Sequence, residues 1–181
     1  MTPPRPFVLV TGNPGKLAES RRIVGFEIEA VPLDLPEVQS LDMEEVVRAK
    51  GREAYRRLGR PVVVEETGLE LAALNGFPGP LVKWMLEAVG AGGIARTAHA
   101  LGDPRATARC LLLWVDGDET VLGEGAAPGE LVPEPRGDAG FGWDPVFRPA
   151  GQELTYAELG DEVKDRVGHR GRAWRDLLFK L

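Results

Sequence analysis

A long β-hairpin signal that follows alternating strand and helix patterns is the feature that most constrains the fold of this chain. Residues 106–115 and 120–132 read as two strands joined at Asp116-Gly-Asp118, which is a strong turn signal. Earlier in the chain, short apolar strands are expected at residues 7–10 and 61–64. Helical patterns occupy about residues 16–24, 42–58, 80–89, 94–101, 161–166 and 170–181. Alternating strands and helices followed by a hairpin predict an α/β fold with a mixed sheet.

The helix expected over residues 42–58 has the clearest boundaries in the sequence. Asp42 can cap its first turn, where Glu44 and Glu45 suit the positive end of the helix dipole. Gly59 supplies a stop signal at the other end. Apolar residues recur between these ends at helical spacing, so we expect this helix to pack one face against the sheet.

The composition predicts a single cytoplasmic domain that covers residues 1–181. A chain of 181 residues with 43% hydrophobic residues can bury one substantial core. No apolar run reaches the roughly 18 residues of a membrane span, and the segment that begins at Met1 lacks the apolar region and cleavage site of a signal peptide. The lone cysteine, Cys110, cannot form an internal disulfide, which agrees with a reducing compartment. The net charge of −6 disfavours a protein that coats DNA or RNA.

The first candidate site is the turn Thr11-Gly-Asn-Pro-Gly-Lys16, which lies between the first strand and the first helix. Backbone N–H groups and a helix dipole at such a turn point toward an anion, and Lys16 adds a mobile positive charge. The spacing of the glycines, with Leu17 after the lysine, differs from that of a Walker A loop. The turn therefore indicates a phosphate site, and an ordinary strand-to-helix turn with a surface lysine is the alternative.

The second candidate site is Glu65-Glu-Thr-Gly68, which we expect where a buried strand leaves the core. Two carboxylates in such a place are costly unless a positive charge compensates them. Mg²⁺ is the natural partner, because it takes one or two carboxylates together with substrate phosphates. The remaining carboxylate could accept a proton from water. A pair of solvated loop acids is the alternative.

Two further segments carry groups that suit a purine base. Gly140-Phe-Gly-Trp-Asp-Pro145 combines two aromatic rings with a carboxylate, and a purine offers both a π face and polar edges. Residues 164–170 gather hydrogen-bond donors near the start of the last helix, among them His169 and Arg170. A core aromatic turn and a solvated helix start are the respective alternatives.

Taken together, these segments resemble one family, the inosine/xanthosine triphosphate pyrophosphatases. The matching motifs, in chain order, are Thr11-Gly-Asn-Pro-Gly-Lys16, Val64-Glu-Glu-Thr-Gly68, Leu74-Asn-Gly-Phe-Pro-Gly-Pro80, Lys83-Trp84, Pro135-Arg-Gly137, Phe141-Gly-Trp-Asp-Pro-Val-Phe147, Thr155-Tyr-Ala-Glu-Leu159 and His169-Arg170. Each motif is weak alone, but the set in this order is specific. The resemblance implies an elongated two-lobed α/β fold with a central cleft, a usual homodimer, and Mg²⁺-dependent hydrolysis of ITP, dITP and XTP to the monophosphate and pyrophosphate.

The resemblance also implies roles for individual residues. The triphosphate would be surrounded by Thr11, Asn13, Lys16, Lys50, Lys83 and Lys164. Gly12, Thr67 and Gly142 are further expected substrate-binding residues. Glu37 and Glu66 would bind Mg²⁺, and Glu66 would also activate the attacking water. Phe141 and Trp143 would enclose the base, whose edge would be read by Asp144, His169 and Arg170.

Two positions depart from the family pattern. Glu66 stands where the family has aspartate, which moves the carboxylate outward, so Glu65 could instead take part of its role. Gly168 replaces a serine that is common before the His-Arg pair. A pyrophosphatase acting on pyrimidine or modified nucleotides is one alternative function, and a nucleotide-binding regulator without catalysis is another.

Overall fold

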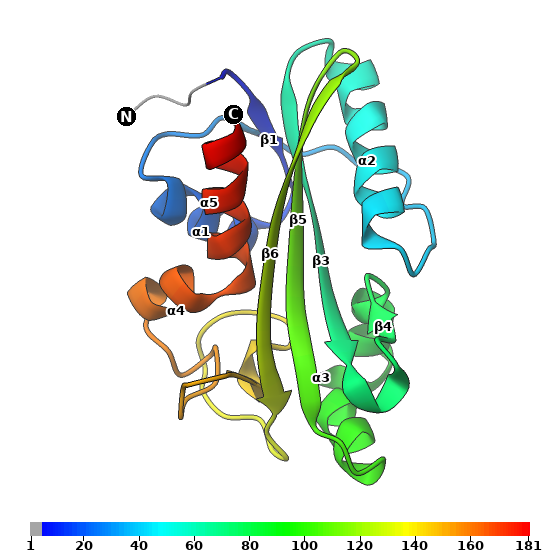
Figure 1. Cartoon of the computed structure of the whole chain (residues 1–181), viewed down its shortest axis with the longest axis vertical. Coiled ribbons are helices and arrows are strands. Elements are labelled where there is room, and N and C mark those ends of the chain that lie inside the picture. The colour runs from blue at the N-terminus through cyan, green and yellow to red at the C-terminus, as the bar shows by residue number, and fades with distance from the viewer. Residues whose placement is uncertain (1–4) are drawn as a thin grey trace.

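Three long strands, β3, β5 and β6, run along most of the length of the molecule and connect its two ends (Figure 1). The computed structural model describes residues 5–181, so the first four residues, on which part of the signal-peptide argument rests, lie outside the described part. The strands are β1 (Val8–Val10), β2 (Ala30–Val31), β3 (Val62–Leu71), β4 (Pro78–Gly79), β5 (Arg105–Asp116), β6 (Glu119–Leu131) and β7 (Phe147–Pro149). The helices are α1 (Pro14–Val24), α2 (Met43–Leu58), α3 (Val82–Ala100), α4 (Asp161–Val167) and α5 (His169–Lys180), with short 3₁₀ turns at Ala72–Leu74 and Asp144–Val146.

The strands form one mixed sheet in the order β2-β1-β3-β5-β6-β7, and β4 also pairs with β3. β1 is parallel to β2 and to β3, whereas the remaining pairs are antiparallel. The hairpin of β5 and β6 turns at Gly117 as predicted, because its positive φ of 62° suits glycine. The prediction of an α/β fold with a mixed sheet is confirmed, while the short strands β2, β4 and β7 were not expected.

The sheet edge formed by β3 is interrupted in its middle. β1 pairs with β3 at Val62 and Val63, and β4 pairs with it at Leu69 and Glu70. Residues 64–68 therefore have no strand neighbour on that edge within the described part of the chain. This interruption leaves an opening in the edge beside the loop that follows β1.

The two carboxylates expected in a loop lie inside a strand. β3 continues without a break from Val62 through Glu65, Glu66 and Gly68 to Leu71, paired along its other edge with β5. The prediction that the strand ends before Glu65 is wrong, because antiparallel pairing with β5 fixes the backbone through these polar positions. Gly68 lies within this strand at a close contact, since a Cβ there would lie 3.0 Å from the backbone of Gly79.

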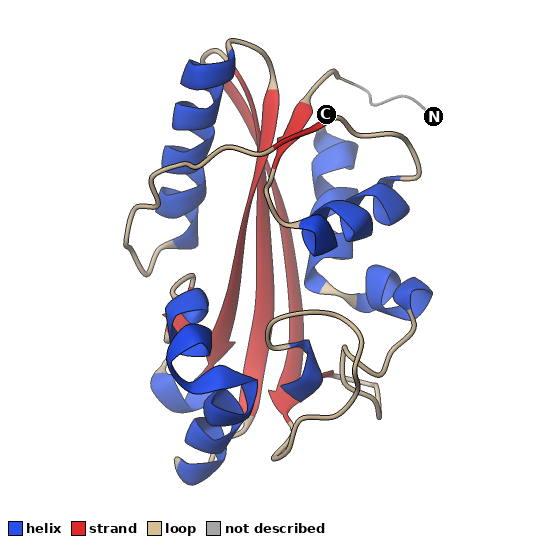
Figure 2. Cartoon of the chain, turned by 180° about the vertical axis from the view of Figure 1, so that it is seen from behind, coloured by secondary structure: helices blue, strands red, loops and turns tan. Residues whose placement is uncertain are grey.

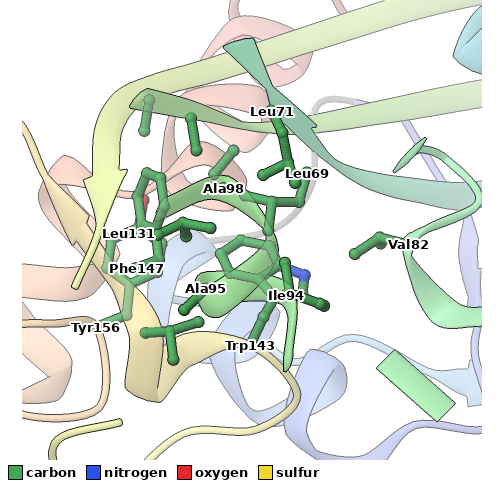
Figure 3. Close-up of a cluster of buried hydrophobic side chains, with 14 of the residues drawn as sticks. Leu69, Leu71, Val82, Ile94, Ala95, Ala98, Leu131, Trp143, Phe147 and Tyr156 are labelled. Atoms are coloured by element: carbon green, nitrogen blue, oxygen red, sulfur yellow. The ribbon is translucent and has the colours of Figure 1, made fainter. Parts of the chain in front are cut away.

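Helices cover the sheet in two lobes that share the long strands. In the lobe that contains β1, α2 packs on one face of the sheet while α1 and α5 pack on the other (Figures 1 and 2). In the other lobe, α3 and the segment around β7 enclose a separate apolar cluster (Figure 3). This arrangement agrees with the expected elongated two-lobed fold.

The helix signals in the sequence match the helix ends of the structure. The Asp42 carboxylate caps α2 by accepting hydrogen bonds from the backbone N–H groups of Glu44 and Glu45, and Gly59 ends the helix in the left-handed region. The two helices expected over residues 80–101 are the two halves of α3, which are separated by a kink at Gly90 with φ of 69°. No helix among residues 5–181 is long and apolar enough to cross a membrane.

Candidate active site

The loop between β1 and α1 is held in shape by its own side chains. The Thr11 hydroxyl accepts a hydrogen bond from the backbone N–H of Asn13 at 3.1 Å. The Asn13 side chain in turn caps α1 by accepting from the backbone N–H of Lys16 at 3.0 Å. Pro14 occupies the first turn of the helix, where its missing N–H costs nothing. The helix therefore begins with its positive end facing the opening in the sheet edge, which favours an anion there.

A cleft of about 780 Å³ lies at this opening and brings most of the predicted site residues together. Its lining includes Thr11, Gly12, Asn13, Lys16, Glu37, Lys50, Thr67, Lys83, Phe141, Gly142, Trp143, Asp144, His169 and Arg170. Glu66 lines an adjoining side pocket of about 110 Å³, which shares Lys16, Glu37, Lys50, Thr67 and Lys83 with the main cleft. Lys164 lines neither of these two spaces. The volume of the main cleft suits a ligand of nucleotide size.

Alternation along β3 sends its two adjacent glutamates to opposite faces of the sheet. Glu66 points to the side of α2, where its Oε2 accepts a hydrogen bond from Lys50 Nζ at 2.7 Å. The same Nζ lies 3.3 Å from Glu37 Oε1, so one ammonium bridges the two predicted metal ligands. The Nζ atom of Lys83 lies 4.0 Å from Glu37. Glu37 and Glu66 therefore share one region, as the predicted metal site requires.

Glu65 points to the other face, where it is surrounded by positive charge. Its two oxygens accept hydrogen bonds from Arg170 Nε at 2.9 Å and Arg170 Nη2 at 3.0 Å. Lys16 Nζ lies 3.0 Å away, and the Thr67 hydroxyl donates at 2.8 Å. Burial opposes ionisation of Glu65, but Arg170 and Lys16 outweigh it and hold its pKa well below the ordinary value. Glu65 therefore remains charged and paired, which makes it a positioning group and a poor base.

Glu19 is a central member of this site that the sequence analysis did not identify. Its buried carboxylate is bonded to both Lys164 and Arg170. Lys164 also donates to Asp144 at 2.7 Å, and Asp144 accepts from the backbone N–H of Phe141 at 2.8 Å. A continuous chain of ion pairs thus joins Glu65, Arg170, Glu19, Lys164 and Asp144. The sequence offers no local signal for Glu19, because its partners Lys164 and Arg170 lie far along the chain.

Lys164 lies among buried ion pairs next to Phe141, and its predicted contact with the triphosphate stays a prediction. Its side chain is 6% exposed and its Nζ lies 5.1 Å from the centre of the Phe141 ring. The Asp144 carboxylate accepts hydrogen bonds from Lys164 and from the backbone N–H of Phe141, and burial raises the pKa of Asp144. Lys164 and Asp144 pair with each other inside the protein, and Asp144 also accepts from the backbone N–H of Phe141. The ion pair therefore fixes the position of the Phe141 segment.

The aromatic residues of the third motif have different environments. Phe141 is partly exposed and rests against Gly15, where an added Cβ would lie 2.8 Å from the ring. Trp143 is 7% exposed and belongs to the apolar cluster, with its ring centre 5.5 Å from that of Phe147 (Figure 3). Phe141 therefore offers a platform to a ligand. Trp143 also lines the cleft, although most of its indole lies in the core, and the enclosure of the base by both rings stays a prediction.

His169 is buried at the start of α5 and lines the cleft. Neither of its ring nitrogens has a hydrogen-bond partner within the described residues, although the ring stacks on Tyr156 at 5.7 Å. Burial, together with the positive charge of Arg170, lowers its pKa well below the ordinary value, so the imidazole is neutral at pH 7. Buried polar atoms without partners are uncommon, and those of His169 are suited to a polar ligand.

Gly168, which precedes His169, has a steric reason to lack a side chain. A Cβ at this position would lie 2.6 Å from the backbone oxygen of Lys164. The junction between α4 and α5 in this protein is therefore too tight for the serine that is common in the family pattern.

The carboxylate oxygens of the side pocket suit a hard cation that binds together with a phosphate-bearing ligand. Among residues 5–181 there is no group of three or more His, Cys, Asp or Glu side chains placed to hold a metal ion. Glu37 and Glu66 nevertheless supply two carboxylates beside three lysines of the cleft, namely Lys16, Lys50 and Lys83. Mg²⁺ commonly binds through one or two carboxylates and takes its other ligands from phosphates and water. The residues present thus suit Mg²⁺ in the company of a phosphate chain.

The fold and this cleft define an α/β protein whose nucleotide-sized cleft is lined by lysines, by the start of a helix and by Phe141, His169 and Arg170. Comparison with known proteins agrees with this class. The Ham1 family model matches residues 7–180. An inosine triphosphate pyrophosphatase from Puccinia graminis f. sp. tritici is 39% identical over 178 residues, which cover 92% of each chain. A dITP/XTP pyrophosphatase from Ignicoccus hospitalis is 42% identical over 177 residues, covering 95% of this chain and 94% of that one.

A solved structure shares the whole architecture. The structure of a HAM1 protein from Coxiella burnetii superposes with a TM-score of 0.83 at 28% identity, and the match covers 96% of both chains. The chain belongs to the Ham1 family.

Proposed function

We propose that this protein hydrolyses deaminated purine nucleoside triphosphates, namely ITP, dITP and XTP, to the nucleoside monophosphate and pyrophosphate. The observation that carries the proposal is one cleft lined by Lys16, Lys50 and Lys83, by the start of α1, and by His169, whose ring nitrogens have no hydrogen-bond partner among residues 5–181. The names of relatives about 40% identical along nearly the whole chain, inosine triphosphate pyrophosphatase and dITP/XTP pyrophosphatase, support the same activity.

The reaction is proposed to depend on Mg²⁺, with Glu37 and Glu66 as the protein ligands. When bound, the ion would neutralise charge on the phosphate oxygens and orient them. Lys16, Lys50 and Lys83 would stabilise the charge that builds on those oxygens during the displacement, which is the main protein contribution in phosphoryl transfer. Glu66 is the carboxylate proposed to orient and deprotonate the attacking water, since Glu65 is fully engaged by Arg170 and Lys16.

Selectivity for deaminated bases is proposed to arise from donors at the end of the cleft. Hypoxanthine and xanthine carry an oxygen at C6, which can accept a hydrogen bond from His169 or Arg170. Adenine carries an amino group there, so a donor would face a donor and leave buried groups unpaired. The neutral state of His169 matters, because a neutral ring offers one donor and one acceptor. Phe141 would provide the stacking face.

The cellular setting follows the resemblance and remains a prediction. A cytoplasmic location agrees with the buried, unpaired Cys110. A homodimer and the absence of a DNA or RNA partner are likewise expected from the resemblance and the net charge of −6.

A nucleotide panel tests the proposal directly. Pyrophosphate release should be measured with ITP, dITP, XTP, ATP, GTP and dUTP, each with and without Mg²⁺. The proposal expects release from the first three that depends on the metal and exceeds release from ATP and GTP. Faster hydrolysis of dUTP would support a pyrimidine pyrophosphatase instead. Binding of ITP without any pyrophosphate would indicate a nucleotide-binding regulator.

A further inference from the structure

Lys50 occupies the centre of the carboxylate pair that is proposed to bind metal. Its ammonium has three acceptor oxygens around it: Glu66 Oε2 at 2.7 Å, Glu37 Oε1 at 3.3 Å and the backbone oxygen of Glu65 at 3.3 Å. An ammonium offers three N–H donors, so these contacts use its whole hydrogen-bonding capacity. The side chains of Lys50 and Glu66 are only 14% and 11% exposed, which limits screening by water.

We propose that Lys50 is a resident cation of this carboxylate pair, which excludes divalent metal until a nucleotide draws the ammonium away. The inference rests on the proposed function, because it takes Glu37 and Glu66 as the metal ligands. A dication and the Lys50 ammonium cannot both sit between the same two carboxylates, since the charges repel at contact distance. Mg²⁺ also gives up its water reluctantly and gains less at a pair of carboxylates whose charge one ammonium has already halved.

The position of Lys50 allows the exchange that the proposal requires. Lys50 lines both the side pocket and the main cleft, where Lys16 and Lys83 are also found. Its four-carbon stem is flexible, so the ammonium can turn from the carboxylates to phosphate oxygens in the main cleft. A triphosphate would thus open the carboxylate pair at the moment when it delivers the further oxygen ligands that the metal needs. Metal and nucleotide binding are then coupled, and each strengthens the other.

The test is a titration of the nucleotide-free, full-length protein with Mn²⁺, followed by electron paramagnetic resonance of the free ion. Lys50→Met removes the ammonium and should raise Mn²⁺ affinity at least tenfold over the wild type. Lys50→Arg restores a cation at the same position and should keep the weak binding of the wild type. Lys83→Met is the matched control, because it removes the same charge from a side chain that is 59% exposed and 4.0 Å from Glu37. This control should change the affinity less than threefold.

A double variant locates the gained site. Adding Glu66→Gln to Lys50→Met should abolish the gain if the metal binds at the carboxylate pair. The proposal is overturned if wild type and Lys50→Met bind Mn²⁺ equally, if Lys83→Met gains as much as Lys50→Met, or if the gain survives Glu66→Gln. Thermal unfolding of each variant confirms that the compared proteins are folded.

The result of the Mn²⁺ titration tests the role of Lys50 separately from the nucleotide panel, which tests the proposed function. Absence of the tenfold gain together with metal-dependent pyrophosphate release from ITP rejects the resident-cation role and leaves the proposed function intact. Presence of the gain without any hydrolysis rejects the proposed function and keeps the competition between Lys50 and metal.

Discussion

Replacement of Glu19, in helix α1, by glutamine should destabilise the protein strongly. Glutamine has nearly the same shape as glutamate but no charge. Glu19 is 6% exposed and is bonded to two buried cations, Lys164 and Arg170. Loss of its charge leaves both cations with less compensation inside the protein, where an unpaired charge is costly.

The size of the effect follows from the partners that remain. Removal of one member of a buried ion pair typically costs about 3–5 kcal/mol. Arg170 keeps Glu65 and Lys164 keeps Asp144, so neither cation becomes wholly unpaired. We therefore expect a loss near the lower end, about 3 kcal/mol. For a protein of this length, that loss corresponds to a decrease of roughly 6–12 °C in Tm.

The assay is equilibrium unfolding in urea at pH 7, with Glu53→Gln as the matched control. Glu53 also bonds two arginines, Arg56 and Arg57, but on the solvent-facing side of α2. Pairs of this kind contribute little, since water and salt screen them, so the control should lose much less stability than Glu19→Gln. Equal losses in the two variants, or a loss below about 1 kcal/mol for Glu19→Gln, would refute the argument that the buried network stabilises the fold.

The pH dependence provides a second check of the same reasoning. Burial opposes ionisation of Glu19, but the charges of Arg170 and Lys164 outweigh it, so its pKa is lowered from the ordinary value of 4.5. A carboxyl whose pKa is lower in the folded state stabilises the protein above pH 4.5 and loses that contribution as the pH falls through the folded pKa. The difference in free energy of unfolding between wild type and Glu19→Gln should therefore shrink below pH 4.5.

Three further variants test the site. Glu66→Gln should reduce kcat for ITP at least 100-fold while ITP binding, measured by calorimetry, persists; near wild-type turnover would remove Glu66 from the mechanism. His169→Phe keeps the packing on Tyr156 and removes two ring nitrogens that have no hydrogen-bond partner in the described part of the chain, so Tm should stay level or rise while KM for ITP increases; an unchanged KM argues against base recognition. Gly168→Ser should cost about 1–3 kcal/mol in urea unfolding, because its Cβ meets the Lys164 backbone oxygen; unchanged stability would contradict this contact.

The parts of the fold that the sequence predicted are those with strong local signals. The hairpin of β5 and β6, the capped helix α2 and the loop before α1 each carry turn or cap residues at defined spacings. The strand through Glu65 and Glu66 was missed, because its pairing with β5 is a long-range interaction that overrides the local polar pattern. The three short strands carry too few residues for a periodic signal.

The sequence predicted which residues line the cleft better than it predicted the contacts that these residues make. Most of the expected residues line the cleft, and those of the first and last motifs lie where helices begin, at the starts of α1 and α5. The placement of Lys164, Trp143 and Glu19 depends instead on how separate helices pack, which spacing along the chain does not encode. Trp143 fills the core, and Lys164 finds two carboxylates that come from distant segments of the sequence.

The division of neighbouring carboxylates between the two faces of β3 has a consequence for how such an enzyme can diversify. The sheet itself separates Glu65, which belongs with the α5 side, from Glu66, which belongs with the α2 side. Under the proposed roles, substitutions around α5 that change which base is accepted leave Glu37, Lys50 and Glu66 in place on the α2 side of the strand. Insertion or loss of a single residue in β3 before Glu65 would instead move each of the two glutamates to the opposite face of the sheet. Both the α5 side and the α2 side of the site would then lose their carboxylate in its present position.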